Sequence, residues 1–167
     1  MKFGASGKIL RVNLTKASVE IEHLPESFYR LYPGGKALAG YFLLKEMQSG
    51  IDPFSPDNLL VFANGLLTGS PISTTTRFTV AARSPLTGGY GESEAGGFWG
   101  PELRNAGWDA ILITGKAETP VYLCIHDDQV SLQPADHLWG QTPEIVQTTI
   151  RDETGEKNMR VLQIGLG

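Results

Sequence analysis

Residues 65–100 read GLLTGSPISTTTRFTVAARSPLTGGYGESEAGGFWG and hold eight of the chain's twenty glycines. Glycine allows a backbone to approach a ligand closely and to adopt positive φ. Serine and threonine hydroxyls and the guanidinium of Arg77 accompany these glycines. Backbone N–H groups, hydroxyls and a guanidinium together are typical of a site that binds a phosphorylated ligand. We therefore expect the functional site in this stretch.

The fold prediction begins from two elements at this stretch, a strand over Arg77–Ala82 and a helix over Gly97–Ala106. Hydrophobic alternation and short apolar runs predict the other strands at Lys8–Leu14, Val19–Ile21, Leu59–Ala63, Ala110–Thr114, Val121–Ile125, Val130–Leu132 and Arg160–Ile164. Helical spacing and start signals predict helices over Lys36–Ser49 and from Thr142 to about Gly155. Strands and helices are mixed, so the expected class is α+β, a single domain with a large mixed β-sheet and packed helices.

Composition limits the classes of function. The 167 residues are 41% hydrophobic and 19% charged, which is typical of one globular domain. A net charge of −4 argues against nucleic-acid binding. No segment approaches the roughly 20 apolar residues of a membrane span. The single cysteine, Cys124, excludes an internal disulfide and a thiolate cluster built by this chain alone, and a cytoplasmic location is expected.

The C-terminal end has an unusual pattern. A strand-like run over Val161–Ile164 leads into Gly165–Leu166–Gly167, and there the sequence stops. A glycine turn after a strand normally leads to another element. We therefore expect the domain to be truncated at its C-terminal end.

Arg77 is the first candidate site residue, and the pattern leaves two interpretations open. If Thr76 and Phe78 face the core, Arg77 points to the other face of the sheet. There it contacts either a cofactor or a neighbouring carboxylate. The second candidate is the pair Gly96–Gly97, because glycines that open a helix expose N–H groups and a positive dipole end to an anion.

Other chemistry-bearing patterns are weaker. The full phosphate-loop pattern is absent, since Gly34–Gly35–Lys36 is followed by alanine. Gly91–Ala95 is similar to a nucleophile elbow and gives a minor alternative, a serine hydrolase that uses Ser93. Residues available for its triad are Asp109, Asp127, His126 and His137, but no HGGG-type oxyanion loop is present. The three histidines show no metal-ligand spacing.

The order of the motifs is more specific than any one of them. In chain order they are the N-terminal GKILRVNLT, Gly34–Ala39, Pro53–Asn58, Gly65–Gly69, Arg77, Ser84–Gly88, Gly96–Leu103, Ala106–Ile111, Gly115–Ala117 and His137–Gly140. This order and spacing resembles the N-terminal domain of the tungsten-containing aldehyde ferredoxin oxidoreductases. The resemblance covers essentially the whole chain, residues 1–167.

The resemblance implies an enzyme that oxidises aldehydes to carboxylic acids and passes the electrons to ferredoxin. Its cofactor is tungsten or molybdenum held by two pterins, with magnesium bridging their phosphates. A [4Fe–4S] cluster, bound by later domains, accepts the electrons. The partners implied are ferredoxin, those later domains, the aldehyde substrate and further copies of the enzyme in a homo-oligomer, with neither nucleic acid nor membrane involved.

The resemblance also assigns site residues. The family arginine that lies between the pterins and the cluster corresponds to Arg77. The family asparagine whose backbone carbonyl binds magnesium falls at Glu94, which is a departure that adds negative charge. The glycine contact that follows corresponds to Gly96, and Gly97 continues it. The alternative hypothesis is a non-catalytic module that binds a phosphorylated ligand or serves as a scaffold for a partner chain.

Overall fold

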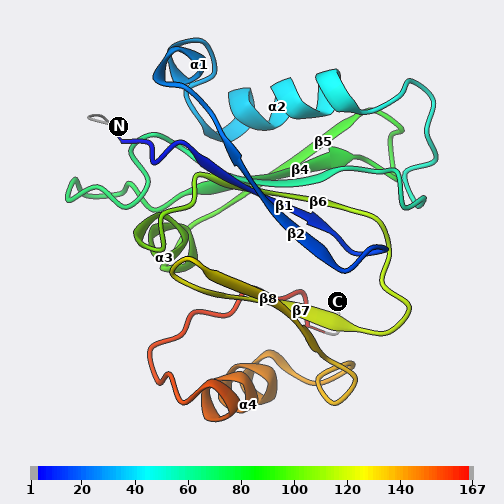
Figure 1. Ribbon diagram of the computed structural model, residues 1–167, viewed down its shortest axis with the longest axis vertical. Coiled ribbons are helices and arrows are strands. Elements are labelled where there is room, and N and C mark those ends of the chain that lie inside the picture. Colours follow the sequence, from blue (N-terminus) through cyan, green and yellow to red (C-terminus); the bar gives the residue numbers. More distant parts are fainter. Residues whose placement is uncertain (1–3, 166–167) are drawn as a thin grey trace.

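The computed structural model describes residues 4–165, and its central element is a six-stranded sheet in the order β2-β1-β6-β3-β4-β5 (Figure 1). The strands are β1 (Lys8–Asn13), β2 (Ser18–His23), β3 (Leu60–Asn64), β4 (Phe78–Arg83), β5 (Tyr90–Ala95) and β6 (Ala110–Thr114). The β1–β6 pair is parallel, and the other neighbouring pairs are antiparallel. The expected α+β class with a large mixed sheet is therefore confirmed.

One face of the sheet is covered by two helices, α1 (Glu26–Leu31) and α2 (Gly35–Glu46), above the sheet in Figure 1. α2 buries Leu38 and Phe42 completely against the sheet residues Val61 and Ala63. Leu38 and Phe42 are four residues apart and therefore lie on the same side of the helix. One apolar face of α2 is thus enough to cover the sheet.

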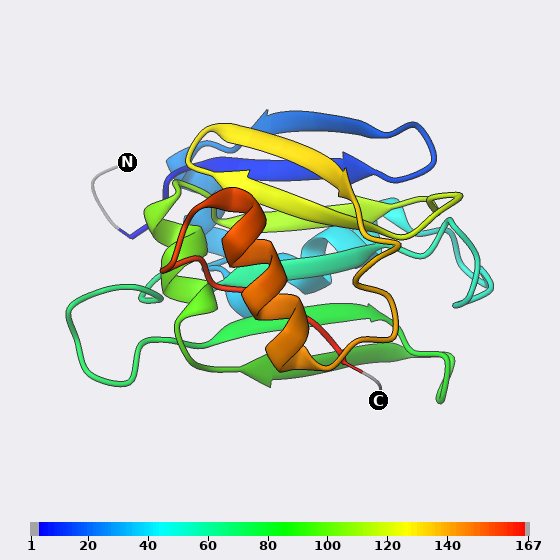
Figure 2. The same ribbon diagram turned by 90° about the horizontal axis from the view of Figure 1, so that it is seen from below.

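The opposite face carries α3 (Trp99–Asn105), the hairpin of β7 (Val121–His126) and β8 (Gln129–Pro134), and α4 (Pro143–Thr154), below the sheet in Figure 1 and toward the viewer in Figure 2. Trp108 is fully buried in an apolar cluster with Leu10, Leu103 and Ile111, and its indole Nε1–H donates to the carbonyl of Asp127, 3.0 Å away. The β7–β8 turn is thereby tied to the large sheet.

The structure differs from the expected elements in three places: one expected strand is absent, and one helix and one strand were not expected. Residues 160–164 form no strand, because no neighbouring strand among the described residues provides a hydrogen-bonding ladder for them. Helix α1 and strand β5 were not predicted; α1 is a helix of six residues, and β5 is an edge strand with an exposed polar pattern. Residues 166–167 of the expected glycine turn lie outside the described residues.

No helix within residues 4–165 is long and apolar enough to cross a membrane.

Candidate functional site

The residues assigned from the sequence meet at the β4–β5 edge of the large sheet. Arg77 directly precedes β4, and the strand register places Thr79 opposite Glu94. Arg77 Nη1 and Glu94 Oε2 are 3.7 Å apart. Gly96 follows β5, and a side chain added there would lie 3.5 Å from the Thr76 hydroxyl, so this loop runs beside the residue before Arg77.

The face on which Arg77 lies follows from its neighbour. Phe78 is buried on the α3 side of the sheet, with its ring centroid 4.7 Å from that of Trp99. Side chains alternate along a strand, so Arg77 and Thr79 point to the α2 side. The side chain of Arg77 is 70% exposed there. This is the orientation expected for Arg77 if Phe78 faces the core.

Lys36, in the first turn of α2, is a member of the site that the sequence analysis did not assign. Its Nζ is 2.6 Å from Glu92 Oε1 and 3.6 Å from Glu94 Oε1. The ion pair with Glu92, reinforced by Glu94, raises the pKa of Lys36 above its ordinary value, so the ammonium stays charged at neutral pH. The Gly34–Gly35–Lys36 sequence belongs to the motifs that carry the resemblance, but it assigned no role to Lys36 itself.

Between these charged groups lies a hollow of about 370 Å³. It is bordered by the start of α2, the loop after β3, the segment leading into β4, and Glu94 of β5. The two loops approach closely, because Gly34 forms an isolated β-bridge with Gly65. The hollow is therefore lined by backbone as well as by the two cations Lys36 and Arg77. We call it the α2 hollow.

The hydroxyls of the 65–77 loop have a structural use. The Gly65 N–H donates to Thr68 Oγ1 (3.0 Å), and the Thr68 hydroxyl donates to the Arg77 carbonyl (2.6 Å). Thr75 Oγ1 donates to the Ile72 carbonyl (2.7 Å) and lies 3.0 Å from Ser70 Oγ. Thr68 and Thr75 thus hold the loop, and so the backbone of Arg77, in place.

A buried charge network supports the other side of this loop. The carboxylate of Asp109, 1% exposed, forms an ion pair with Arg104 and accepts hydrogen bonds from the Tyr29 hydroxyl (2.7 Å) and the Gly7 N–H (2.7 Å). Arg104 Nη2 donates in turn to the Gly65 carbonyl (2.8 Å). Burial, followed by the neighbouring Asp109 carboxylate, raises the pKa of Tyr29.

The minor hydrolase alternative is wrong in its structural basis. Ser93 lies within strand β5 and not at a strand-to-helix turn, so it does not form a nucleophile elbow. Asp109, considered for its triad, is occupied by the buried network. His137 pairs instead with Glu153 at 2.7 Å. Within residues 4–165 no group of three or more His, Cys, Asp or Glu residues is arranged to hold a metal ion.

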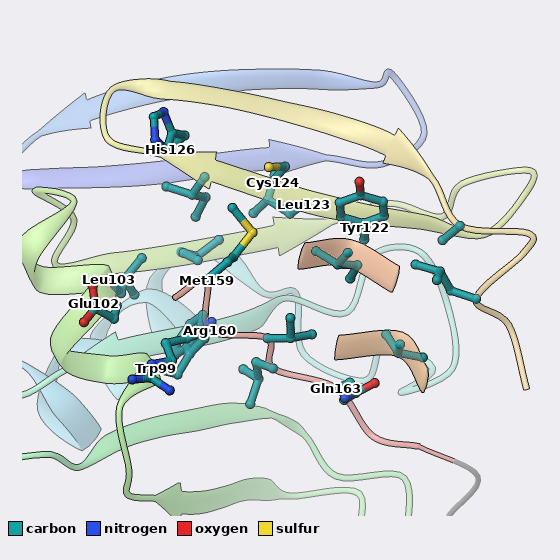
Figure 3. A pocket seen from close by; sticks show the side chains of 18 of the residues that line it. Trp99, Glu102, Leu103, Tyr122, Leu123, Cys124, His126, Met159, Arg160 and Gln163 are labelled. Atoms are coloured by element: carbon teal, nitrogen blue, oxygen red, sulfur yellow. The ribbon is translucent and has the colours of Figure 1, made fainter. Parts of the chain in front are cut away.

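A larger crevice of about 840 Å³ lies on the other face of the sheet (Figure 3). Its lining is mostly apolar and comes from α3, β7 and the segment after α4, with Trp99, Leu123 and Met159 among the side chains that face it. Arg160 also lines it, and its guanidinium lies 4.3 Å from the ring centroid of Phe98. None of the residues assigned from the sequence as cofactor contacts lines this crevice.

Comparison with known proteins shows the family to which this chain belongs. The family described as "Aldehyde ferredoxin oxidoreductase, N-terminal domain" matches residues 9–167. The "Tungsten-containing aldehyde ferredoxin oxidoreductase" of Pyrococcus abyssi is 45% identical over 163 residues, which are 98% of this chain and 27% of that protein. The "Aliphatic sulfonate oxidoreductase, WOR-like subunit" of Pyrococcus furiosus is 35% identical over 93% of this chain and 25% of that protein.

A solved structure is also similar to this chain over nearly all of its residues. The "Active site complex BamBC of Benzoyl Coenzyme A reductase in complex with 1,5 Dienoyl-CoA" matches with a TM-score of 0.95 and 38% identity, over 99% of this chain and 25% of that chain. This chain thus spans about a quarter of the length of each of these relatives. Because the match covers nearly all of its residues in both sequence and structure, the chain belongs to the aldehyde ferredoxin oxidoreductase family, whose N-terminal domain it represents.

Proposed function

We propose that residues 1–167 form the cofactor-binding domain of an oxidoreductase that carries tungsten or molybdenum on two pterins. The observation that carries the proposal is the placement of two cations, Lys36 and Arg77, around a hollow lined by closely approaching backbone. The chain has a net charge of −4, so it must concentrate positive charge locally to accept a phosphorylated ligand. The α2 hollow brings two cations, Lys36 and Arg77, to one site.

The proposal gives roles to six residues in or beside the α2 hollow. Arg77 and Lys36 bind negative groups of the cofactor, and the loop of Gly96 and Gly97 lets the backbone approach it. The backbone carbonyl of Glu94 is assigned to magnesium. Thr68 keeps the Arg77 backbone in register with the loop. When bound, the metal and pterins supply the oxidation–reduction chemistry, while these residues supply orientation and electrostatics.

The activity that we propose for the complete enzyme is oxidation of an aldehyde to a carboxylic acid, with ferredoxin as the electron acceptor. We assign the [4Fe–4S] cluster, the substrate pocket and the ferredoxin contact to parts of the enzyme outside this chain. This division is supported by the chain's share of about a quarter of each relative. We therefore expect no aldehyde oxidation by the 167 residues alone.

Replacing Arg77 by alanine should lower the pterin content of the complete enzyme by at least about tenfold, since charge-assisted hydrogen bonds contribute roughly 1.5–3 kcal/mol each. The unfolding midpoint should stay unchanged, because the side chain is 70% exposed. Pterin released by denaturation and measured by fluorescence gives the readout. Arg30→Ala is the matched control, since that side chain is 74% exposed and lies on α1, outside the α2 hollow.

Metal analysis of the natural enzyme separates the two hypotheses for this chain. The cofactor-binding proposal expects tungsten or molybdenum in protein produced with both metals supplied. Absence of both metals, with the fold intact, would contradict it and favour the non-catalytic binding or scaffold module. Normal pterin content in the Arg77→Ala enzyme would show instead that Arg77 is only a surface arginine paired with Glu94.

A further inference from the structure

Four charged side chains, two of each sign, lie in or directly beside the α2 hollow. Lys36 and Arg77 are the cations, and Glu92 and Glu94 are the carboxylates. The carboxylate of Glu94 lies between the cations, with Oε1 3.6 Å from Lys36 Nζ and Oε2 3.7 Å from Arg77 Nη1. Glu94 therefore occupies the position from which a ligand anion would contact both cations.

The two carboxylates are held with different strength. Glu92 Oε1 is at hydrogen-bond distance from Lys36, 2.6 Å. Both contacts of Glu94 exceed 3.5 Å, so attraction between charges holds it without a hydrogen bond. Its partners are 56% and 70% exposed, and exposed ion pairs contribute little, typically 0–1 kcal/mol. A ligand can therefore displace Glu94 at small cost.

We propose that Glu94 is an internal counter-anion of the α2 hollow, which a multiply charged phosphate ligand displaces from between Lys36 and Arg77. This inference rests on the proposed cofactor-binding function and adds to it a residue that competes with the ligand for the two cations. Two cations and two carboxylates leave the rim neutral, so a singly charged anion gains little by replacing Glu94. A pyrophosphate-type group carries more negative charge and gains more electrostatic energy from the two cations. A multiply charged group is therefore the ligand that displaces Glu94 from between the two cations.

The experiment measures binding of inorganic pyrophosphate and of acetate to the 167-residue chain, by NMR titration at low ionic strength. We expect Glu94→Gln to tighten pyrophosphate binding about fivefold and acetate binding by a smaller factor, because removing one negative charge changes the electrostatic energy of a bound ligand in proportion to the ligand's own charge. The gain should shrink as salt is added, since screening weakens exposed charges. Lys36→Gln should weaken pyrophosphate binding in both backgrounds.

Glu20→Gln is the matched control, because it removes the same charge from an exposed position on β2, the opposite edge of the sheet. An affinity for pyrophosphate in Glu94→Gln that equals that of wild type or of Glu20→Gln would overturn the inference. So would a failure of Glu94→Gln to bind pyrophosphate at all. If Arg77→Gln weakens binding while Glu94→Gln changes nothing, the inference fails and the proposed function stands. Absence of metal and pterin from the natural enzyme tests that function separately.

Discussion

Replacing Asp109 by asparagine should lower the free energy of unfolding by about 3–5 kcal/mol, because it leaves the Arg104 guanidinium buried without its counter-charge. Asp109 is 1% exposed and the Arg104 side chain 14% exposed, so water can replace the lost partner only in small part. The carboxylate also accepts hydrogen bonds from Tyr29 and from the backbone N–H groups of Ser6 and Gly7. An asparagine amide cannot accept all of them.

Urea unfolding followed by circular dichroism measures this effect. Glu26→Gln is the control, since it breaks an exposed ion pair with Arg30 one helical turn away, and should change stability by no more than about 0.5 kcal/mol. Similar stability losses for the two variants would contradict the view that the Asp109 network holds the chain together. The network joins the segment before β1, helix α1, helix α3 and the Gly65 loop. The loss should therefore appear as one cooperative transition.

The parts of the fold that the sequence predicts well are those where a buried apolar pattern and a local signal agree. The N-terminal hairpin is an example, because alternation and a four-residue turn indicate the same pairing. The last helix is another: Thr142 is its N-cap, Pro143 opens it, and Gly155 ends it in the left-handed conformation. In both cases the information needed lies within a few residues.

The parts that were not predicted depend on distant partners. Strand β5 carries two glutamates and, within residues 4–165, pairs only with β4, so its sequence lacks the apolar alternation of a core strand. Residues 160–164 have the opposite problem: their composition suits a strand, but a strand requires a partner in space. Periodicity reports which side chains are buried and does not report which backbone is available for pairing.

The candidate site likewise has residues that the sequence predicted and one residue that it did not. The resemblance assigned Arg77, Glu94 and Gly96, and the structure brings them to one edge of the sheet. Lys36 was missed because it reaches the α2 hollow from a helix 41 positions before Arg77 in the chain. Its role depends on the close contact between the Gly34 and Gly65 loops, which no local pattern reveals. That contact leads to the last prediction.

Replacing Gly34 by alanine should lower the free energy of unfolding by about 2–5 kcal/mol. Gly34 has φ 81° and ψ −173°, a conformation that is essentially restricted to glycine and costs other residues about 1–3 kcal/mol. A Cβ there would also lie 2.4 Å from the backbone oxygen of Asn64, and relieving such a contact costs typically a further 1–3 kcal/mol. The two loops that border the α2 hollow must then separate.

Gly40→Ala is the matched control within the same helix. Gly40 lies inside α2, and a Cβ there meets nothing within 4 Å. This substitution should therefore stabilise the chain by about 0.5–1 kcal/mol, the usual advantage of alanine over glycine in a helix. Both variants are compared by urea unfolding and by pyrophosphate titration. If Gly34→Ala is as stable as wild type and binds pyrophosphate equally well, the close approach of the Gly34 and Gly65 loops is not required for the α2 hollow. A loss of both stability and binding, with Gly40→Ala unaffected in binding, would instead tie the shape of the α2 hollow to this one backbone contact.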